Sequence, residues 1–355
     1  MLENIEDLKK INITKPDKIV YKKVQANWDA VAKPLDGMGR FEKIIDQIGA
    51  IQGSAQIDIS KKAVIIMCAD NGVVSEGVSQ SGQEVTLAVA HSMAKKQSSV
   101  GRMAKMIGAE TIPVDIGINS TEKIAGVLDR KVSCGTRNFA LEPAMTQEEA
   151  LKAIETGVDI VRSCKGNGYA LLATGEMGIG NTTTSAAMAA ALLGCDAERV
   201  TGKGAGLDDK GLVTKINVIK NALKKYELYD ADAFTVLRTV GGLDIAGLAG
   251  VCIGGAIYHV PIVLDGVISM VAALCADRMV DGVKEFIIPS HIGKEPAVKL
   301  LAEALDIEPV IDGQLALGEG TGAVMMFSLL DMAMSIYGDR TTFDDIKVEQ
   351  YERYE

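Results

Sequence analysis

The chain has 355 residues, of which 48% are hydrophobic and 24% are charged, and its formal net charge is −10. This length and apolar content suffice for a large buried core, so the sequence predicts a globular protein with one large domain. The acidic balance argues against a protein that wraps nucleic acid or lies on an anionic membrane, because both need basic surface.

Short apolar runs bounded by turn residues alternate with longer helical patterns along most of the chain. This alternation predicts an α/β fold with a mostly parallel, Rossmann-like sheet and helices on both faces. Ligands of such folds bind beyond the carboxyl ends of the strands. The expected strands are 63–67, 111–114, 169–173, 261–264 and 286–288, and the expected helices are 84–107, 147–164, 182–193, 210–226, 244–258 and 266–279.

The two ends of the chain differ from the middle. Residues 1–33 and 321–355 look helical, with no strand between the helices. We therefore expect them to pack together as a small helical domain beside a large α/β catalytic domain at residues 34–320.

Cysteine and histidine usage narrows the chemistry. The six cysteines are scattered singly without a CxxC pair, which indicates buried free thiols. The three histidines, His91, His259 and His291, lack the spacing of the usual zinc motifs.

The N-terminus is polar and acidic, unlike a secretory signal, and glycines, His259 and Pro261 interrupt the longest apolar runs. We expect a cytoplasmic protein with no metal, no cofactor and no membrane span.

Glu319 lies between Gly318 and Gly320, where a loop becomes an apolar helix. Small neighbours let a substrate approach the backbone, and a carboxylate there could act as a general base. The alternative is an ordinary glutamate of the first helical turn that complements the helix dipole. The local sequence favours neither interpretation over the other.

The expected strand at 169–173 runs into TGEMGIGNTTT, residues 174–184, and then into an alanine-rich helix. Glycines let the backbone curl around an anion, and a helix N-terminus presents free N–H groups to a phosphate. The segment therefore indicates a phosphate-binding loop, although it is neither a Walker A loop nor GxGxxG. A tight turn in which Thr182 caps the helix is the alternative.

A second glycine cluster, TGKGAGLDD at 201–209, precedes the helix that carries Lys215. Lys203 and Lys215 are candidate phosphate ligands, although single lysines on a helix are more often solvated. The acid pair Asp208 and Asp209 could hold Mg²⁺, and N-capping explains it equally well. A third loop, residues 68–86, mixes small and hydrogen-bonding residues, as in a pocket wall for a flat polar ligand.

Together these segments resemble the nicotinate-nucleotide:5,6-dimethylbenzimidazole phosphoribosyltransferase family, which makes the lower-ligand nucleotide of cobalamin. The similar blocks follow the family's order over nearly the whole chain. They are KPLDGMGRFE, NGVVSEGVSQSGQEVT, GTRNFALEPAMT, TGEMGIGNTT, TGKGAGLDD, VGGLDIAGLAG, LDGVIS, SHIGKEP and LALGEGTGA.

The resemblance implies transfer of the 5-phosphoribosyl group of nicotinate mononucleotide to 5,6-dimethylbenzimidazole, with β-to-α inversion. The products would be α-ribazole 5′-phosphate and nicotinate. The pyridinium leaving group already carries positive charge and can depart as a neutral ring nitrogen, so no metal is required to neutralise it. The family also implies a homodimer.

The resemblance also assigns roles to residues. Glu319 would be the general base, and Glu176 would place negative charge near an oxocarbenium-like ribose. The expected nucleotide-binding residues are Gly178, Ile179, Gly180, Asn181, Thr182, Lys215, Ser290 and His291, and the expected base-binding residues are Ser79, Gln83 and Leu317. The segment with Ser290 and His291 is often contributed across the family's dimer.

The chain departs from the family pattern at several positions. Leu35, Asp36 and Met38 replace residues of KPPGSLGRLE, Asn71 stands in a loop that is often Gly-Asp-His-Gly-Val, and Ala316 replaces a common arginine. Because this loop differs from the family pattern, the sequence does not identify the acceptor base.

A related transferase for a phenolic or purine base, including one that works as a subunit of a heterodimer, is therefore the nearest alternative. An inactive nucleotide-binding paralogue is another, which the intact Glu319 disfavours. A dinucleotide dehydrogenase is more distant, because no GxGxxG occurs.

Overall fold

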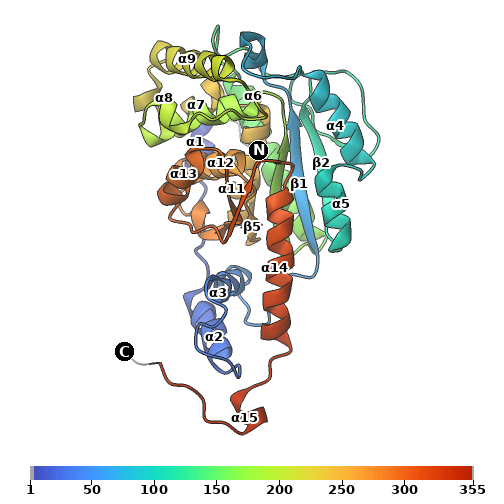
Figure 1. The fold of residues 1–355 in the computed structure, drawn as a ribbon, viewed down its shortest axis with the longest axis vertical. Helices are drawn as coiled ribbons and strands as arrows, with labels where there is room; N and C mark the ends of the chain where they lie inside the picture. Colours follow the sequence, from blue (N-terminus) through green and yellow to red (C-terminus); the bar gives the residue numbers. More distant parts are fainter. Residues whose placement is uncertain (1–3, 354–355) are drawn as a thin grey trace.

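A computed structural model describes residues 4–353 of the chain, and Figure 1 shows its fold. The predicted small helical domain includes residues 1–3 and 354–355, which lie outside the described residues. Within residues 4–353, a six-stranded parallel sheet has the order β3-β2-β1-β4-β5-β6. This is the strand order of doubly wound nucleotide-binding folds, whose ligands bind where the order reverses, here between β1 and β4. The predicted parallel sheet is confirmed.

The sheet strands are β1 (Lys62–Ala69), β2 (Glu110–Gly117), β3 (Leu128–Asp129), β4 (Leu171–Met177), β5 (Ile262–Val263) and β6 (Ile287–Ile288). A separate parallel pair joins β7 (His291–Gly293) to β8 (Ile311–Leu315). The helices are α1 (Ile5–Lys9), α2 (Lys18–Asp29), α3 (Arg40–Gln52), α4 (Glu84–Ala94), α5 (Ser99–Met106), α6 (Gln147–Gly166), α7 (Asn181–Leu193), α8 (Ala197–Val200), α9 (Asp209–Lys225), α10 (Ala233–Val240), α11 (Leu243–Tyr258), α12 (Val267–Met279), α13 (Ala297–Leu305), α14 (Thr321–Gly338) and α15 (Phe343–Ile346). Short 3-10 helices span Gly72–Glu76, Leu228–Asp230 and Val283–Phe286.

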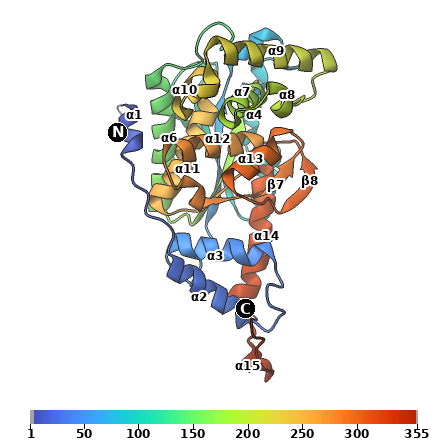
Figure 2. The same cartoon turned by 90° about the vertical axis from the view of Figure 1, so that its left-hand side faces the viewer.

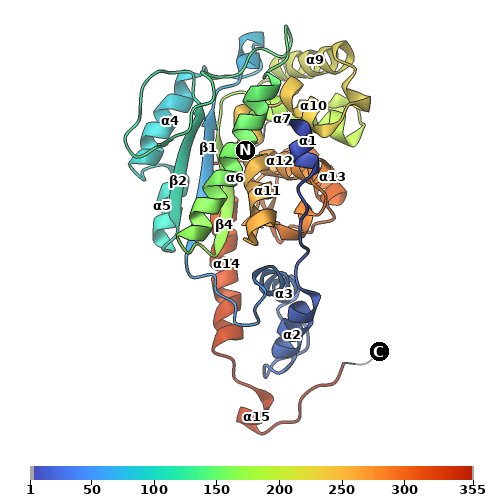
Figure 3. The same ribbon diagram turned by 180° about the vertical axis from the view of Figure 1, so that it is seen from behind.

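Strand β1 shows why the sheet is buried on both faces. Side chains alternate along a strand, so Ile65 and Met67 enter one core with helices α6, α11 and α12. Ile66 and Cys68 enter a second core with α3, α4, α5 and α14. Every residue of β1 is buried, which explains its continuous apolar sequence and confirms helices on both faces. Figure 3 shows α6 and α11 from behind.

Several sequence expectations need correction. The helix expected at 84–107 is two helices, α4 and α5, because Lys96 takes a left-handed backbone (φ 54°) and Ser98 caps a new helix through Gly101 N–H. The helices α3, α10 and α13 and the strands β3, β7 and β8 were not predicted. The short strands lack a long apolar run, and the pairing of β7 with β8 joins segments distant in sequence.

The N-terminal and C-terminal segments meet below the sheet. Helix α2 packs on α3, an antiparallel bridge joins Val31 to Thr342, and the Trp28 and Tyr337 rings lie 5.1 Å apart. Figures 1 and 2 show α2 and α3 beside the lower part of α14. The last turns of α14 thus connect these segments to the sheet.

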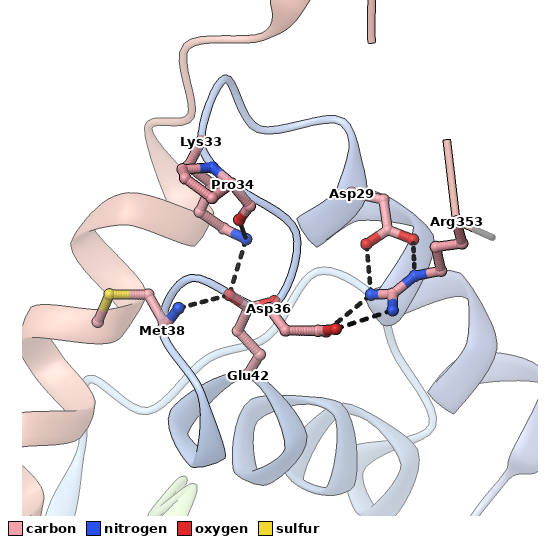
Figure 4. A network of polar contacts seen from close by, with 7 residues as sticks. All are labelled: Asp29, Lys33, Pro34, Asp36, Met38, Glu42 and Arg353. Atoms are coloured by element: carbon pink, nitrogen blue, oxygen red, sulfur yellow. Dashed lines mark hydrogen bonds and ion pairs between the residues drawn. The ribbon is translucent and has the colours of Figure 1, made fainter. Parts of the chain in front are cut away.

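A polar network holds the loop before α3 (Figure 4). Arg353 forms paired hydrogen bonds with Asp29, at 2.7 and 2.8 Å, and with Asp36, at 2.8 and 3.0 Å. The nearly buried ion pair of Lys33 with Glu42 (2.7 Å) fixes the same loop, and Glu42 also accepts the backbone N–H of Met38 at 2.8 Å. The network therefore ties residues near both ends of the chain together.

Helix α14 is long and apolar enough to cross a membrane by length and composition, but half of its 18 residues are buried inside the protein. It packs on α3, α5 and β4. Its composition is therefore explained by its place in the second core of the α/β fold.

Candidate active site

A cleft of about 250 Å³ opens at the carboxyl ends of the parallel strands. Residues from four strand ends line it, namely Glu176 at the end of β4, Asp265 after β5, His291 after β6, and Ser79 from the loop after β1. The loop that enters α14 closes the cleft with Glu319. The position agrees with the rule that ligands of doubly wound sheets bind where the strand order reverses.

Glu319 has a left-handed backbone (φ 61°) between Gly318 (φ 80°) and Gly320 (φ 95°). A positive φ is uncommon for a residue with a Cβ atom, so this loop holds Glu319 in a strained conformation. The loop lies directly on β4, because a Cβ atom at Gly175 would come within 2.5 Å of the Glu319 carbonyl oxygen. One carboxylate oxygen, Oε2, accepts the Val100 N–H at 3.0 Å.

Glu176 is buried at the wall of the same cleft. Its carboxylate accepts a hydrogen bond from Asn181 Nδ2, which also donates to Asp244 at 3.1 Å. Burial and the neighbouring Asp244 raise the pKa of Glu176 to about 8, and burial raises the pKa of Asp244 to about 6. Burial thus favours the neutral forms of these two carboxyl groups, and a cationic group bound beside them would favour their ionised forms. Within residues 4–353, no group of three or more His, Cys, Asp or Glu side chains is arranged to hold a metal ion.

The predicted phosphate loop leads from β4 into α7. Gly180 caps this helix with φ 92°, and its own Cβ would lie 2.7 Å from a Val74 methyl group, so only glycine fits. Gly178, Ile179, Asn181 and Thr182 all line the cleft beside the helix N-terminus, where the helix dipole favours an anion.

Lys215 reaches the phosphate loop from α9. It is fully buried, donates to Thr182 Oγ1 at 2.8 Å, and burial lowers its pKa to about 8. A Cβ atom at Gly204 would lie 2.7 Å from Thr182 Oγ1, so the second glycine cluster approaches both residues closely. Lys203 lines the cleft, whereas Lys215 does not; Lys203 is half exposed and pairs with Asp209 at 2.7 Å.

Asp265 follows β5 and is 2% exposed. Its carboxylate accepts the N–H groups of Gly322 (2.8 Å), Gly320 (3.2 Å) and Ala323 (3.3 Å) at the start of α14. Burial raises its pKa, while His291 and these N–H groups oppose the increase. The Asp265 carboxylate therefore occupies the N-terminus of the helix that follows Glu319.

His291 lines the cleft, whereas the predicted nucleotide-binding residue Ser290 is fully buried and does not line it. The Ser290 hydroxyl is 3.0 Å from His291 Nδ1 and also donates to the Asp265 carbonyl oxygen at 3.2 Å. Burial lowers the pKa of His291, and the nearby Asp265 opposes this.

Of the three residues expected to bind the base, two line the cleft and one does not. Ser79 and the exposed Leu317 line the cleft. Gln83 lies outside the lining, where it donates to the Asn71 carbonyl oxygen at 3.3 Å and accepts from Asn119 at 2.8 Å. The neighbouring Gln80 lines the cleft instead and donates to the Gly206 carbonyl oxygen.

Sequence reasoning did not single out Asp244, Asp265 or Gln80. Asp244 and Asp265 each belong to a block that carried the family resemblance, VGGLDIAGLAG and LDGVIS. An acid in an otherwise apolar run, or just after a strand, was the available signal. It would not have revealed the partners, which come from segments far away in sequence.

Comparisons with known proteins agree with this geometry. A sequence profile described as phosphoribosyltransferase matches residues 13–348. Two relatives bear the name nicotinate-nucleotide–dimethylbenzimidazole phosphoribosyltransferase. The one from Ruminiclostridium cellulolyticum is 42% identical over 99% of both chains, and the one from Acetivibrio thermocellus is 46% identical over 93% of this chain and 94% of its own.

A crystal structure of CobT from Thermus thermophilus superimposes with a TM-score of 0.89 at 35% identity, covering 94% of this chain and 100% of that one. The fold, the length and the sequence similarity thus agree. The chain belongs to the nicotinate-nucleotide–dimethylbenzimidazole phosphoribosyltransferase family.

Proposed function

We propose that the protein transfers the 5-phosphoribosyl group of nicotinate mononucleotide to 5,6-dimethylbenzimidazole or a similar lower-ligand base. The products are α-ribazole 5′-phosphate and nicotinate. The observation that carries this proposal is the meeting of Glu319 and Glu176 with the phosphate loop in one cleft. A general base, a negative wall and an anion site are the three elements that this transfer needs.

The phosphate of the nucleotide binds at the N-terminus of α7. Gly178, Ile179, Gly180, Asn181 and Thr182 surround it. Lys215, which is buried and hydrogen-bonded to Thr182, supplies the positive charge. His291, supported by Ser290, forms the adjoining wall. Phosphate binding favours the protonated form of Lys215, whose pKa burial lowers to about 8.

The reaction exchanges one C1′–N bond for another. The bond from C1′ to the pyridinium nitrogen breaks, and its electron pair leaves with nicotinate. A benzimidazole nitrogen attacks C1′ from the opposite face, which inverts β to α. The cationic nucleotide favours the ionised form of the buried Glu176, whose pKa without a ligand is about 8, and the carboxylate then places negative charge beside the ribose. Glu319 takes the proton from the second benzimidazole nitrogen.

The base binds between Ser79 and Leu317, with Gln80 at the margin and Gln83 behind the loop. Leu317 is 57% exposed, so this side of the cleft is open. An open apolar edge can admit bases of several shapes, which keeps phenols and purines as alternative acceptors. Competition among dimethylbenzimidazole, adenine and p-cresol measures the preference.

We also propose a domain division, a cellular location and an oligomeric state for the protein. The proposal keeps the predicted division into a catalytic domain at residues 34–320 and a small helical domain from residues 1–33 and 321–355, except that Leu8 of α1 is buried in the core of the α/β domain. The contact of α2 with α3 supports a boundary that places residues 40–52 with the small domain as well. We further propose a homodimer, as the family resemblance implies, and a cytoplasmic location, which the polar, acidic N-terminal sequence favours.

The decisive experiment incubates the purified protein with nicotinate mononucleotide and dimethylbenzimidazole and follows nicotinate release. NMR of the product reports the configuration at C1′. The proposal expects an α-linked product and release that depends on the base. Tight nucleotide binding without release on any of the three bases would instead indicate the inactive paralogue.

A further inference from the structure

Asp265 contacts the loop of Glu319 through the loop's backbone rather than through the Glu319 side chain. Oδ2 accepts the N–H of Gly320, the residue next to Glu319, at 3.2 Å. Oδ1 accepts the N–H of Gly322 at 2.8 Å and of Ala323 at 3.3 Å. One carboxylate therefore binds three of the first four amides after Glu319.

The loop requires such an anchor. Residues 318–320 have consecutive positive φ values, and two of the three are glycines with wide conformational freedom. The left-handed Glu319 is costly and persists only when surrounding contacts impose it. Asp265 supplies those contacts from the segment just after β5, which is paired on both sides in the sheet.

The Asp265 carboxyl is itself held in place. A Cβ atom at Gly322 would lie 3.0 Å from Asp265 Oδ1 and 2.0 Å from His291 Nδ1, so the imidazole and the carboxyl pack against the same point of α14. His291 lines the cleft where the nucleotide is proposed to bind.

We propose that Asp265 is the positioning residue of the reaction, which holds the Glu319 loop in the conformation that presents the general base to the acceptor. The proposal rests on the function proposed above. It assigns Asp265 no proton transfer and no contact with the reacting atoms. Changing Asp265 should therefore lower kcat and leave the KM values of the substrates nearly unchanged.

A purely structural role as a cap of α14 is the competing explanation, and Asp331 provides the matched control. Asp331 lies on the same helix and pairs with the buried Lys62, remote from the cleft lining. Asp331→Asn weakens α14 without touching the Glu319 loop. Asp265→Asn is nearly isosteric, but its amide group turns a donor towards the N–H of either Gly320 or Gly322.

For Asp265→Asn we expect kcat to fall on the order of 100-fold, because small misplacements of a catalytic group have effects of that size. The KM values of both substrates should stay within about threefold of wild type. Asp331→Asn should lose thermal stability and keep its kcat. Equal kcat losses in the two variants at equal melting temperatures would overturn the proposal.

Amide hydrogen exchange tests the anchor without using activity. The amides of Gly320 and Gly322 should exchange about tenfold or more faster in Asp265→Asn than in wild type, and should be unchanged in Asp331→Asn. Unchanged exchange in Asp265→Asn overturns the anchoring role. If the wild-type protein releases no nicotinate, the proposed function fails together with the catalytic role, whereas the exchange result still decides the anchoring.

Discussion

The carboxylate of Glu319 accepts a hydrogen bond of 3.0 Å from the backbone N–H of Val100, in the first turn of α5. The base and its donor are separated by more than half of the chain, and α5 packs on α14. A helix N-terminus favours a negative charge, so α5 orients the carboxylate while Asp265 fixes the backbone of its loop. Two independent contacts therefore determine where the general base lies.

Glu319→Gln should lower kcat about 10²- to 10⁴-fold, the usual contribution of a general base, with little change in the KM of nicotinate mononucleotide. Glutamine keeps an acceptor for Val100 N–H, so the loop should keep its conformation. Steady-state kinetics measure both constants. Glu308→Gln, at an exposed partner of Arg40, is the control. A kcat equal to that of wild type would assign the base to another residue.

Glu176→Gln should stabilise the protein while reducing turnover. The folded-state pKa of Glu176 is about 8, raised by burial from an ordinary value of 4.5. The folded state therefore retains a proton that the unfolded state loses, and wild-type stability falls as pH rises from about 4.5 to 8. The melting temperature of the variant should exceed that of wild type by an amount that grows over this window. A constant difference across the window would contradict the buried, protonated state.

Lys215→Met should raise the KM of nicotinate mononucleotide about 10- to 100-fold, because a charge-assisted hydrogen bond to phosphate is lost. The wild-type lysine is charged below its pKa of about 8 and neutral above it. The wild-type KM should therefore rise with pH above about 8, and the variant should show no such rise. Lys203→Met, which removes a half-exposed lysine paired with Asp209, should have a smaller effect. A larger effect at Lys203 would reassign the phosphate ligand.

Gly322→Ala should destabilise the protein by about 1–3 kcal/mol, because the added Cβ atom would come within 2.0 Å of His291 Nδ1. Activity should fall as well, since both His291 and Asp265 would have to move. Gly338→Ala at the other end of α14 meets no atom within 4 Å and should be neutral or slightly stabilising. Thermal unfolding of the two variants compares them directly. Equal stabilities would show that α14 shifts freely at its N-terminus.

The sequence by itself determined the parallel sheet, most of its long helices and the two loops that matter most. The apolar run of β1 and the glycines of TGEMGIGNTT are local signals, because burial on both faces and tight turns each require particular residue types at adjacent positions. Local signals of the same kind, glycines beside a polar side chain at the start of a helix, singled out Glu319 and the phosphate loop.

Only the tertiary structure decided which side chains share the site. Asp265 meets Gly320 across 55 residues, Lys215 meets Thr182 across 33, and Val100 meets Glu319 across 219. Such contacts follow from the strand order and from helix packing, which a local pattern does not encode. For the same reason the sequence did not distinguish Gln83 from Gln80. Gln83 forms hydrogen bonds with Asn71 and Asn119, while Gln80 lines the cleft.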